Sequence, residues 1–165
     1  MDNLNPLLKG VSRSFYLSLR VLPAELRPQI STAYLLARAS DTVADTRAVP
    51  REDRLDILKR MQGGDFESVR GVSEKQALPA EAELLARLGE VSAVKASFSV
   101  EDRGLIDRLL DTIISGQIFD LERFPGEDAE SLTALSEESE LDRYTYLVAG
   151  CVGEFWTRMC GLHLP

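Results

Sequence analysis

Histidine, cysteine and long uncharged segments are scarce in this 165-residue chain. His163 is the single histidine, so a Ser-His-Asp triad has no credible base and metal sites built from histidines are excluded. Cys151 and Cys160 are nine residues apart and point to opposite sides of any helix that holds both, which excludes a local disulfide or metal pair. Triad hydrolases and histidine-ligated metalloenzymes are therefore not expected.

Positive charge is also in short supply. The chain has 19 Lys and Arg against 27 Asp and Glu, a formal net charge of −8, and its basic residues form no block. Because phosphate contacts need clustered Lys and Arg, we expect no nucleic-acid partner, and an anionic substrate would need a bridging metal. The longest uncharged stretch, Tyr144 to Gly153, is about half of what a bilayer-spanning helix requires, so we expect a cytoplasmic protein.

Strand signals are scarce as well. There is no sustained apolar and polar alternation and no Asn-Gly or Asp-Gly pair, whereas helix-period runs recur between Pro and Gly, which predicts an all-α fold in one domain. Gly10 is expected to be a soft spot in the first helix, and Pro23 is expected in the first turn of the second. The expected helices cover residues 6–20, 23–46, 51–61, 79–94, 100–123 and 141–161, with loops over 65–78 and 124–140.

The helix around Tyr34 carries the most informative pattern. At about 100° per residue, Tyr34, Arg38, Asp41 and Asp45 fall on one narrow stripe. Two carboxylates one turn apart repel each other by a few tenths of a kcal/mol, so the pair needs solvent or a counter-charge, and a divalent cation is the natural one. An exposed polar stripe remains the alternative, although Tyr34 and Ile30 on the same side are unusual for a solvated face.

A second helix places polar groups on an apolar face. Gln117 lies near the centre of the face that includes Ile113, and Asp120 lies at its margin. Burying such groups without partners costs about 1 to 3 kcal/mol each, so we expect them to face a water-filled cavity. An interhelical hydrogen bond is the open alternative.

The last expected helix is apolar almost all round between Tyr144 and Gly153, so we expect it inside a bundle. Gly150 and Gly153 would permit close approach of a neighbouring helix or a ligand. Tyr144 and Val148 share one face, for which core packing and a binding wall are both open interpretations. Inward carboxylates in a helical bundle are the arrangement expected of a Mg²⁺ site that holds a phosphorylated ligand.

Four segments in order resemble one family. They are SRSFYLSLRVLP (Ser12–Pro23), AYLLARASDTVAD (Ala33–Asp45), IISGQIFDL (Ile113–Leu121) and YTYLVAGCVGEFWT (Tyr144–Thr157). On these motifs the chain resembles the squalene/phytoene synthases, which are head-to-head prenyltransferases. The resemblance implies an all-α isoprenoid (terpenoid) synthase fold and the condensation of two prenyl diphosphates, typically farnesyl diphosphate, to squalene, phytoene or a related product. Mg²⁺ would assist loss of diphosphate. NADPH would be a further cofactor if the product is squalene, but the sequence gives no support for NADPH binding.

The resemblance also implies roles for individual residues. Asp41 and Asp45 would be Mg²⁺ ligands of the first aspartate motif, and Tyr144 would lie near the reacting carbons, which makes these three the catalytic candidates. Arg38 would contact one diphosphate. The other implied substrate-binding residues are Ser12 and Arg13 at the second diphosphate, and Phe15, Tyr34, Gln117, Val148, Ala149, Gly150 and Gly153 along the cavity.

One family motif has no counterpart in this sequence, namely the second aspartate-rich motif. We therefore expect residues 1–165 to form the amino-terminal part of a single isoprenoid synthase domain, to bind Mg²⁺ poorly and to be inactive alone. A non-catalytic assembly or partner-binding module and a plain helical interaction bundle are the alternatives. Peripheral membrane association, self-association and pairing with a carboxy-terminal half are further hypotheses.

Overall fold

The computed structural model describes residues 2–12, 14–124, 126 and 129–164, and these residues form helices and connections with no strand. The predicted all-α fold class is confirmed. The α-helices are α1 (Asn5–Ser12), α2 (Phe15–Arg20), α3 (Arg27–Asp45), α4 (Arg51–Gln62), α5 (Arg70–Ser73), α6 (Pro79–Ala86), α7 (Leu88–Ala96), α8 (Val100–Arg123), α9 (Glu138–Thr145) and α10 (Cys151–His163). Short turns are η1 (Asp2–Leu4) and η2 (Ala129–Ser131), both 3₁₀, and the π-helical η3 (Tyr146–Gly150).

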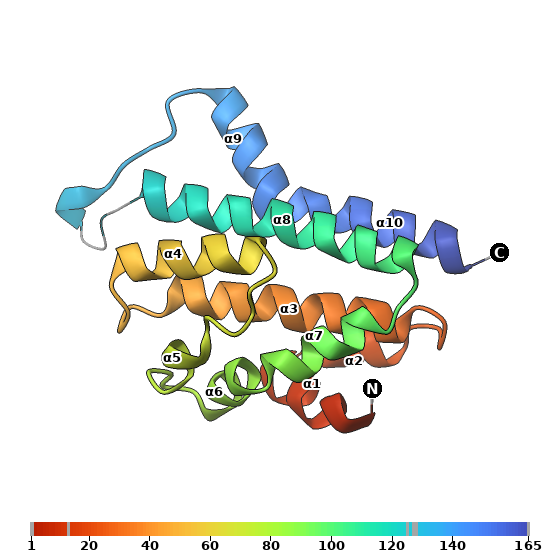
Figure 1. Ribbon diagram of the computed structural model, residues 1–165. Coiled ribbons are helices and arrows are strands. Elements are labelled where there is room, and N and C mark those ends of the chain that lie inside the picture. The colour runs from red at the N-terminus through yellow and green to blue at the C-terminus, as the bar shows by residue number, and fades with distance from the viewer. Residues whose placement is uncertain (1, 13, 125, 127–128, 165) are drawn as a thin grey trace.

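Helix α8 lies at the centre of the arrangement, where it packs against α3, α4 and α10 (Figure 1). Helix α3 also contacts α6 and α7, and α6 contacts α1. Helix α9 projects away from the bundle (Figure 1) and buries none of its side chains. The two longest helices, α3 and α8, therefore form the frame that positions the site.

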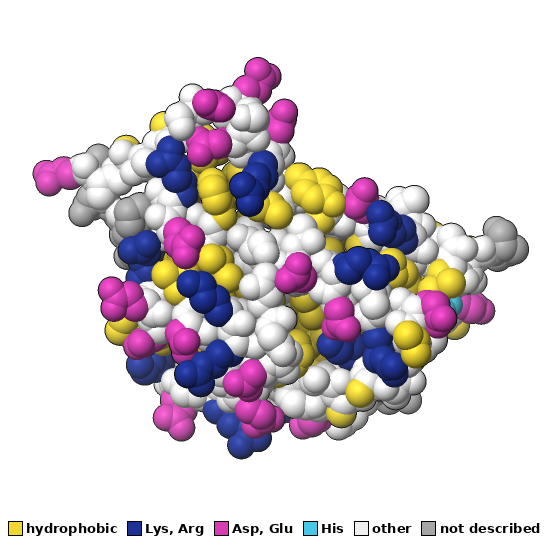
Figure 2. Space-filling model, turned by 45° about the horizontal axis from the view of Figure 1, so that its top comes forward, with side chains coloured by type: hydrophobic (Ala, Val, Ile, Leu, Met, Phe, Trp, Pro, Cys, Tyr) yellow, Lys and Arg dark blue, Asp and Glu magenta, His cyan; other side chains and the backbone are white. Residues whose placement is uncertain are grey.

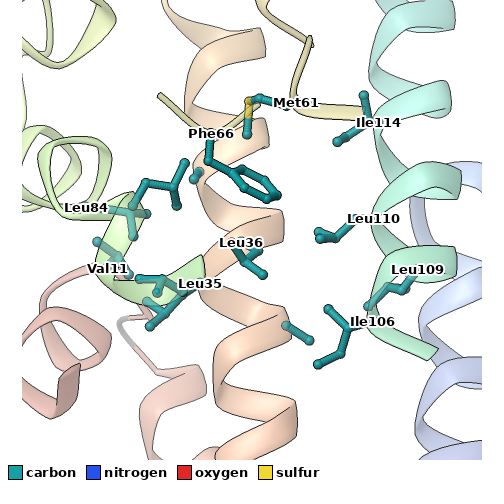
Figure 3. Packing of buried hydrophobic residues seen from close by; sticks show 14 of the residues in the cluster. Val11, Leu35, Leu36, Met61, Phe66, Leu84, Ile106, Leu109, Leu110 and Ile114 are labelled. Carbon is teal, nitrogen blue, oxygen red and sulfur yellow. The ribbon is translucent and has the colours of Figure 1, made fainter. Parts of the chain in front are cut away.

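The hydrophobic core lies on both sides of α3, towards α8 on one side and towards α1 and α6 on the other (Figure 3). Leu36 of α3 is fully buried and lies opposite Ile106 and Leu110 of α8. Met61 and Phe66 close the core at the end of α4 and in the loop that follows it (Figure 3). Full burial of a side chain of this kind stabilises the fold by about 1.5–3 kcal/mol, so this packing fixes α3 against α8.

Two helices have the boundaries that the sequence predicts. Helix α4 begins at Arg51 and ends one residue beyond the predicted Met61, before a turn in which Gly64 adopts a φ of 88°. Helix α8 begins after Ser99, whose hydroxyl accepts a hydrogen bond from the backbone N–H of Asp102 at 3.0 Å. A serine at this position satisfies an otherwise free N–H of the first turn, which is why the start of α8 could be predicted.

The prediction of one helix over residues 6–20 is wrong, because this segment forms two helices, α1 and α2. The break follows Ser12 and not the expected soft spot at Gly10. Gly10 remains helical, and a Cβ atom there would lie 3.2 Å from the Cβ of Ala80. The absence of a side chain at Gly10 lets α6 approach α1, so helix packing outweighs the weak helix propensity of glycine.

Helix α3 begins at Arg27, later than predicted, and Pro28 instead of Pro23 lies in its first turn. The backbone N–H of Leu26 donates to the Pro23 carbonyl at 3.1 Å, so the preceding residues form a separate turn. The Leu26 side chain is 1% exposed. Its burial in the core therefore fixes this turn and delays the start of the helix.

The helix predicted over residues 79–94 is divided into α6 and α7 at Arg87. The Arg87 guanidinium pairs with Glu83 on one side of the bend and Glu90 on the other, and it also donates to the Asn3 carbonyl at 3.1 Å. These contacts hold the bend against the amino-terminal segment. The predicted loop over residues 65–78 contains the short helix α5, which the sequence did not indicate.

The helix predicted over residues 141–161 is interrupted by the π turn η3. The expectation that residues 144–153 lie inside a bundle is also wrong, since Tyr146 is 44% and Val148 is 40% exposed. Figure 2, which brings the α9 side forward, shows hydrophobic side chains in the open between acidic and basic ones. Among the described residues, no helix has both the length and the apolar character needed to cross a bilayer.

Candidate functional site

A polar cavity of about 470 Å³ lies between α3, α8 and the segment formed by α9 and η3. Helix α3 contributes Arg38, Asp41 and Asp45 to it, so the side chains of the predicted stripe do meet on one wall. The full lining is Tyr34, Ala37, Arg38, Asp41, Ala44, Asp45, Ile113, Gln117, Asp120, Leu121, Tyr144 and Val148.

Arg38 connects two carboxylates that come from different helices. Its Nη1 donates to Asp41 Oδ2 and its Nη2 donates to Glu81 Oε1 of α6, each at 2.5 Å. The planar guanidinium can serve two acceptors at once because its donors point in fixed directions. The Arg38 side chain is therefore held in one orientation at the wall of the cavity.

The two aspartates on α3 repel each other as their spacing predicts. The pKa of Asp41 lies above its ordinary value, first because partial burial disfavours the charged form and next because Asp45 adds a second negative charge. The Arg38 guanidinium acts in the opposite direction without cancelling these effects. A cation at this position would relieve the repulsion.

Tyr144 and Asp120 form a hydrogen-bonded pair on the other wall. The phenol donates to Asp120 Oδ1 at 2.6 Å, and the rings of Phe119 and Phe124 lie 5.9 and 6.0 Å from the Tyr144 ring. This hydrogen bond raises the pKa of Tyr144 to about 12, with partial burial and the carboxylate charge acting in the same direction. Tyr144 is therefore a neutral phenol of fixed orientation at physiological pH.

Two buried polar atoms near the cavity have no hydrogen-bond partner among the described residues. They are Gln117 Oε1, an acceptor, and Arg38 Nε, a donor. The alternative of an interhelical hydrogen bond is realised at Asp120, which accepts from Tyr144 of α9, but not at Gln117 Oε1. Leaving a buried polar group unpaired costs about 1–3 kcal/mol.

A second cavity of about 270 Å³ adjoins the first and is almost entirely apolar. Three residues, Tyr34, Ala37 and Ile113, line both cavities. Its other lining residues are Phe15, Ile30, Ala33, Leu109, Val152, Phe155 and Trp156. A charged cavity that shares a wall with an apolar one suits a molecule with an anionic head and a hydrocarbon tail.

The candidates from the first helices have different environments. Phe15 lines the apolar cavity, and its ring centroid lies 5.2 Å from that of Tyr34. Ser12 is buried and donates to the Leu8 carbonyl of its own helix at 2.5 Å, so it lines neither cavity. Arg13 lies outside the described residues.

Ala149, Gly150 and Gly153 are exposed and line neither cavity. The predicted close approach of a neighbouring helix does not occur at Gly153, where a Cβ would meet no atom of another helix within 4 Å. The close approach occurs instead at Gly116 of α8, where a Cβ would lie 3.0 Å from the Cβ of Leu147. The π turn changes the register of this segment, which turns the small residues outward.

Sequence reasoning did not identify Glu81, Val152 or Trp156. The two residues of α10, Val152 and Trp156, lie at helical spacing with Phe155, so following that pattern along α10 would have found them. Glu81 carried no such signal, because an acidic residue in the first turn of a helix is ordinary. Only the tertiary contact between α3 and α6 reveals its position.

The carboxylates of α3 are the metal-ligand candidates. Among the described residues, no group of three or more His, Cys, Asp or Glu is placed to share an ion, so Asp41 and Asp45 form a pair. Carboxylate oxygens are suitable Mg²⁺ ligands, and a bound cation would act against the burial and the Asp45 charge that raise the pKa of Asp41. The pair therefore fits a Mg²⁺ ion that takes its other ligands from water and phosphate.

His163 has a structural partner and lies outside both cavities. Its Nε2 is 2.6 Å from Oδ1 of the buried Asp102, and Gln29 donates to the other carboxylate oxygen at 3.3 Å. This contact joins α10, α8 and α3 at one end of the bundle.

The helical arrangement is that of an all-α terpenoid synthase. A solved complex of TcSQS with the ligand BPH1237 matches 98% of this chain with a TM-score of 0.77 at 23% identity, and a complex of TcSQS with E5700 matches 96% with a TM-score of 0.70 at 22% identity. The matched regions are 44% and 43% of those chains.

The sequence identifies the family within this class. The family model described as squalene/phytoene synthase matches residues 8–165, so the chain belongs to the squalene/phytoene synthase family.

Curated relatives agree with this assignment. The chain is 28% identical to a bifunctional lycopene cyclase/phytoene synthase of Sporisorium reilianum, over 96% of this chain and 26% of that protein. It is 28% identical to inactive squalene synthase 2 and 26% identical to squalene synthase 1 of Arabidopsis thaliana, each over 89% of this chain and 33% of the relative. The chain thus spans about a third or less of these relatives.

Proposed function

We propose that this chain provides the part of a head-to-head prenyl synthase site that contains the first aspartate motif. In this proposal the chain binds farnesyl diphosphate or a similar prenyl diphosphate together with Mg²⁺. The observation that carries the proposal is the pair of adjoining cavities. The polar one presents Asp41, Asp45 and Arg38, and the apolar one begins at the shared residues Tyr34 and Ile113. A diphosphate fits the first and a prenyl chain fits the second.

The charged residues would each bind a different part of the head group and its metal ion. Asp41 and Asp45 would hold Mg²⁺, which when bound would neutralise diphosphate and make it a better leaving group. Arg38 would donate to phosphate oxygens from the wall of the polar cavity. Gln117 would line the cavity beside the head group.

Tyr144 would act at the reacting end of the prenyl chain. Its phenol is protonated at physiological pH, as in an ordinary tyrosine, and the hydrogen bond to Asp120 fixes the orientation of its neutral aromatic face. Such a face stabilises a nearby carbocation through its quadrupole. The apolar wall formed with Phe155 and Trp156 would exclude water from that cation.

Ligand-dependent melting tests this proposal. Mg²⁺ and farnesyl diphosphate together, at about ten times the dissociation constant, should raise the Tm of the chain by about 2–6 °C. D41N and D45N should lose most of this shift, because each removes one of two carboxylates that bind the ion. D56N is the matched control, since Asp56 is an exposed carboxylate of α4 paired with Arg60.

Two results would count against prenyl diphosphate binding. One is a wild-type chain that melts at the same temperature with and without the ligands. The other is a shift that persists undiminished in both D41N and D45N. Omitting Mg²⁺ should remove most of the wild-type shift, which separates binding through the metal from direct binding of the anion.

A non-catalytic synthase-like module is the second candidate. One curated relative, 28% identical over 89% of this chain, is named an inactive squalene synthase, and it is as similar as relatives named for activity. Such a module has no need of the polar cavity for its role. It would fold and pair with partners equally well as D41N or D45N, whereas the proposed synthase half would lose its ligand.

A further inference from the structure

Glu81 is a partly buried acid that contacts Arg38 on the side away from the polar cavity. Its side chain is 16% exposed, its Oε1 accepts from Arg38 Nη2, and it does not line the polar cavity. Leu84 and Leu85 on the same helix are at most 1% exposed, so α6 is firmly packed. Glu81 therefore reaches the cavity by direct contact only through Arg38, while its negative charge also helps to raise the pKa of Asp41.

The two carboxylates that hold Arg38 have different surroundings. The Asp41 side chain is 46% exposed and lines the cavity, and it is a candidate Mg²⁺ ligand under the proposed function. A cation bound to Asp41 would compete with the Arg38 guanidinium for the same oxygens. Glu81 lies behind Arg38 and faces no such competition, so its contact with Nη2 would persist.

We infer that Glu81 is a positioning residue that keeps Arg38 at the cavity wall when Mg²⁺ occupies Asp41. The Nη1 donor released from Asp41 would then be available to an anionic ligand. The ligand class is a diphosphate or another anion of similar size. This inference rests on the proposed function, because it assumes a cation at Asp41.

A simpler role for Glu81 is stabilisation of the first turn of α6 by its negative charge. Glu83 provides a control for loss of a carboxylate of α6 that does not contact Arg38. It lies two residues along on the same helix, is 54% exposed and pairs with Arg87 instead of Arg38. If the role of Glu81 were purely structural, its substitution would change the stability of the chain without changing the order of Arg38.

The first experiment measures the order of Arg38 without any ligand. In wild-type chain labelled with ¹⁵N, the Arg38 Nε–Hε and Nη–H signals, assigned by their loss in R38K, should show slow rotation of a held guanidinium. E81Q should shift these signals and broaden the Nη signals through faster rotation. E83Q should leave them unchanged.

The second experiment measures binding of inorganic pyrophosphate with Mg²⁺ by titration calorimetry. E81Q should weaken the affinity about tenfold, as expected for loss of a charge-assisted contact, while E83Q should stay within about twofold of wild type. Melting curves recorded without ligand separate a loss of folding from a loss of affinity.

The two experiments together test the positioning role of Glu81. Loss of Arg38 order with weakened pyrophosphate binding in E81Q supports this role. Unchanged Arg38 signals, or lower stability with unchanged affinity, overturns it and leaves the proposed function intact. Wild-type chain that is folded and holds Arg38 but binds no Mg²⁺-pyrophosphate overturns the proposed function, and Glu81 is then only half of a structural ion pair.

Discussion

At the scale of single residues, the carboxylates on the two walls of the polar cavity differ in their surroundings. On α3, Asp41 and Asp45 repel each other, and the pKa of Asp41 is raised. On the facing wall, Asp120 accepts a hydrogen bond from Tyr144 and the pair is satisfied. A cation would therefore stabilise the α3 wall, and the facing wall offers a phenol of fixed orientation.

The Tyr144 and Asp120 pair predicts an unusual titration. At about pH 11, between the ordinary phenol pKa near 10 and the value of about 12, Tyr144 should remain protonated in the wild type. D120N should let it ionise, because the negative charge that favours the proton is gone. NMR of chain labelled with ¹³C at the tyrosine ring carbons reads the phenol state directly, with Y144F assigning the signal.

The sign of the linked stability follows from the raised pKa. The folded chain holds this proton more tightly than the unfolded chain, so the contribution of Tyr144 is complete below about pH 10 and declines as the pH rises towards about 12. D111N, which changes an exposed carboxylate of α8 that binds Gln62, should leave the Tyr144 signal as in wild type. Ionisation of Tyr144 near pH 10 in the wild type would contradict the assigned hydrogen bond.

At the scale of elements, the contact between α8 and η3 decides the shape of the carboxyl-terminal segment. Gly116 leaves no room for a side chain, since a Cβ there would also lie 3.2 Å from the backbone carbon of Leu147. The π turn then redirects the chain, so α9 projects from the bundle while α10 packs along α8 (Figure 1). This geometry brings Tyr144 to the polar cavity and Trp156 to the apolar one.

The close contact predicts opposite effects of alanine at two glycines of α8. G116A should destabilise the chain by about 1–3 kcal/mol, because the new methyl group meets the backbone of η3 and overpacking outweighs the gain in helix propensity. G104A should stabilise it by up to about 1 kcal/mol, since the nearest atom is the flexible end of Arg108 at 3.5 Å. Urea unfolding curves give both values, and equal stability of the two variants would refute the contact.

At the scale of the whole molecule, the described residues form a half-enclosed site on a helical frame. The polar cavity contains one aspartate pair on α3, and no second cluster of metal ligands faces it among the described residues. Mg²⁺ bound by two carboxylates depends heavily on water and phosphate oxygens. Exposed apolar side chains such as Leu17 and Val21, at 67% and 82%, leave self-association as a prediction for light scattering to test.

This incomplete metal shell predicts binding without turnover by the 165-residue chain. Incubation with Mg²⁺ and farnesyl diphosphate should release diphosphate at the rate of a blank without protein, because one aspartate pair stabilises the leaving group too weakly. An enzyme-coupled diphosphate assay measures this, with a full-length squalene synthase as the positive control. Clear release that D41N abolishes would show that the chain is catalytic alone.

The sequence by itself determined the helical class and one wall of the site. Helix-period spacing predicts α4 and α8, because their faces and caps are local features of the chain. The angular position of Tyr34, Arg38, Asp41 and Asp45 is also local, since any regular helix places them on one face.

Only the tertiary structure decided the remaining features, because they depend on contacts between residues distant in sequence. The start of α3 depends on burial of Leu26, and the bend at Arg87 depends on its contact with the Asn3 carbonyl. The outward turn of Gly153 depends on the approach of η3 to α8, and the role inferred for Glu81 depends on α6 lying behind α3. Periodicity along one helix carries no information about its neighbour, which is why these features could not be predicted.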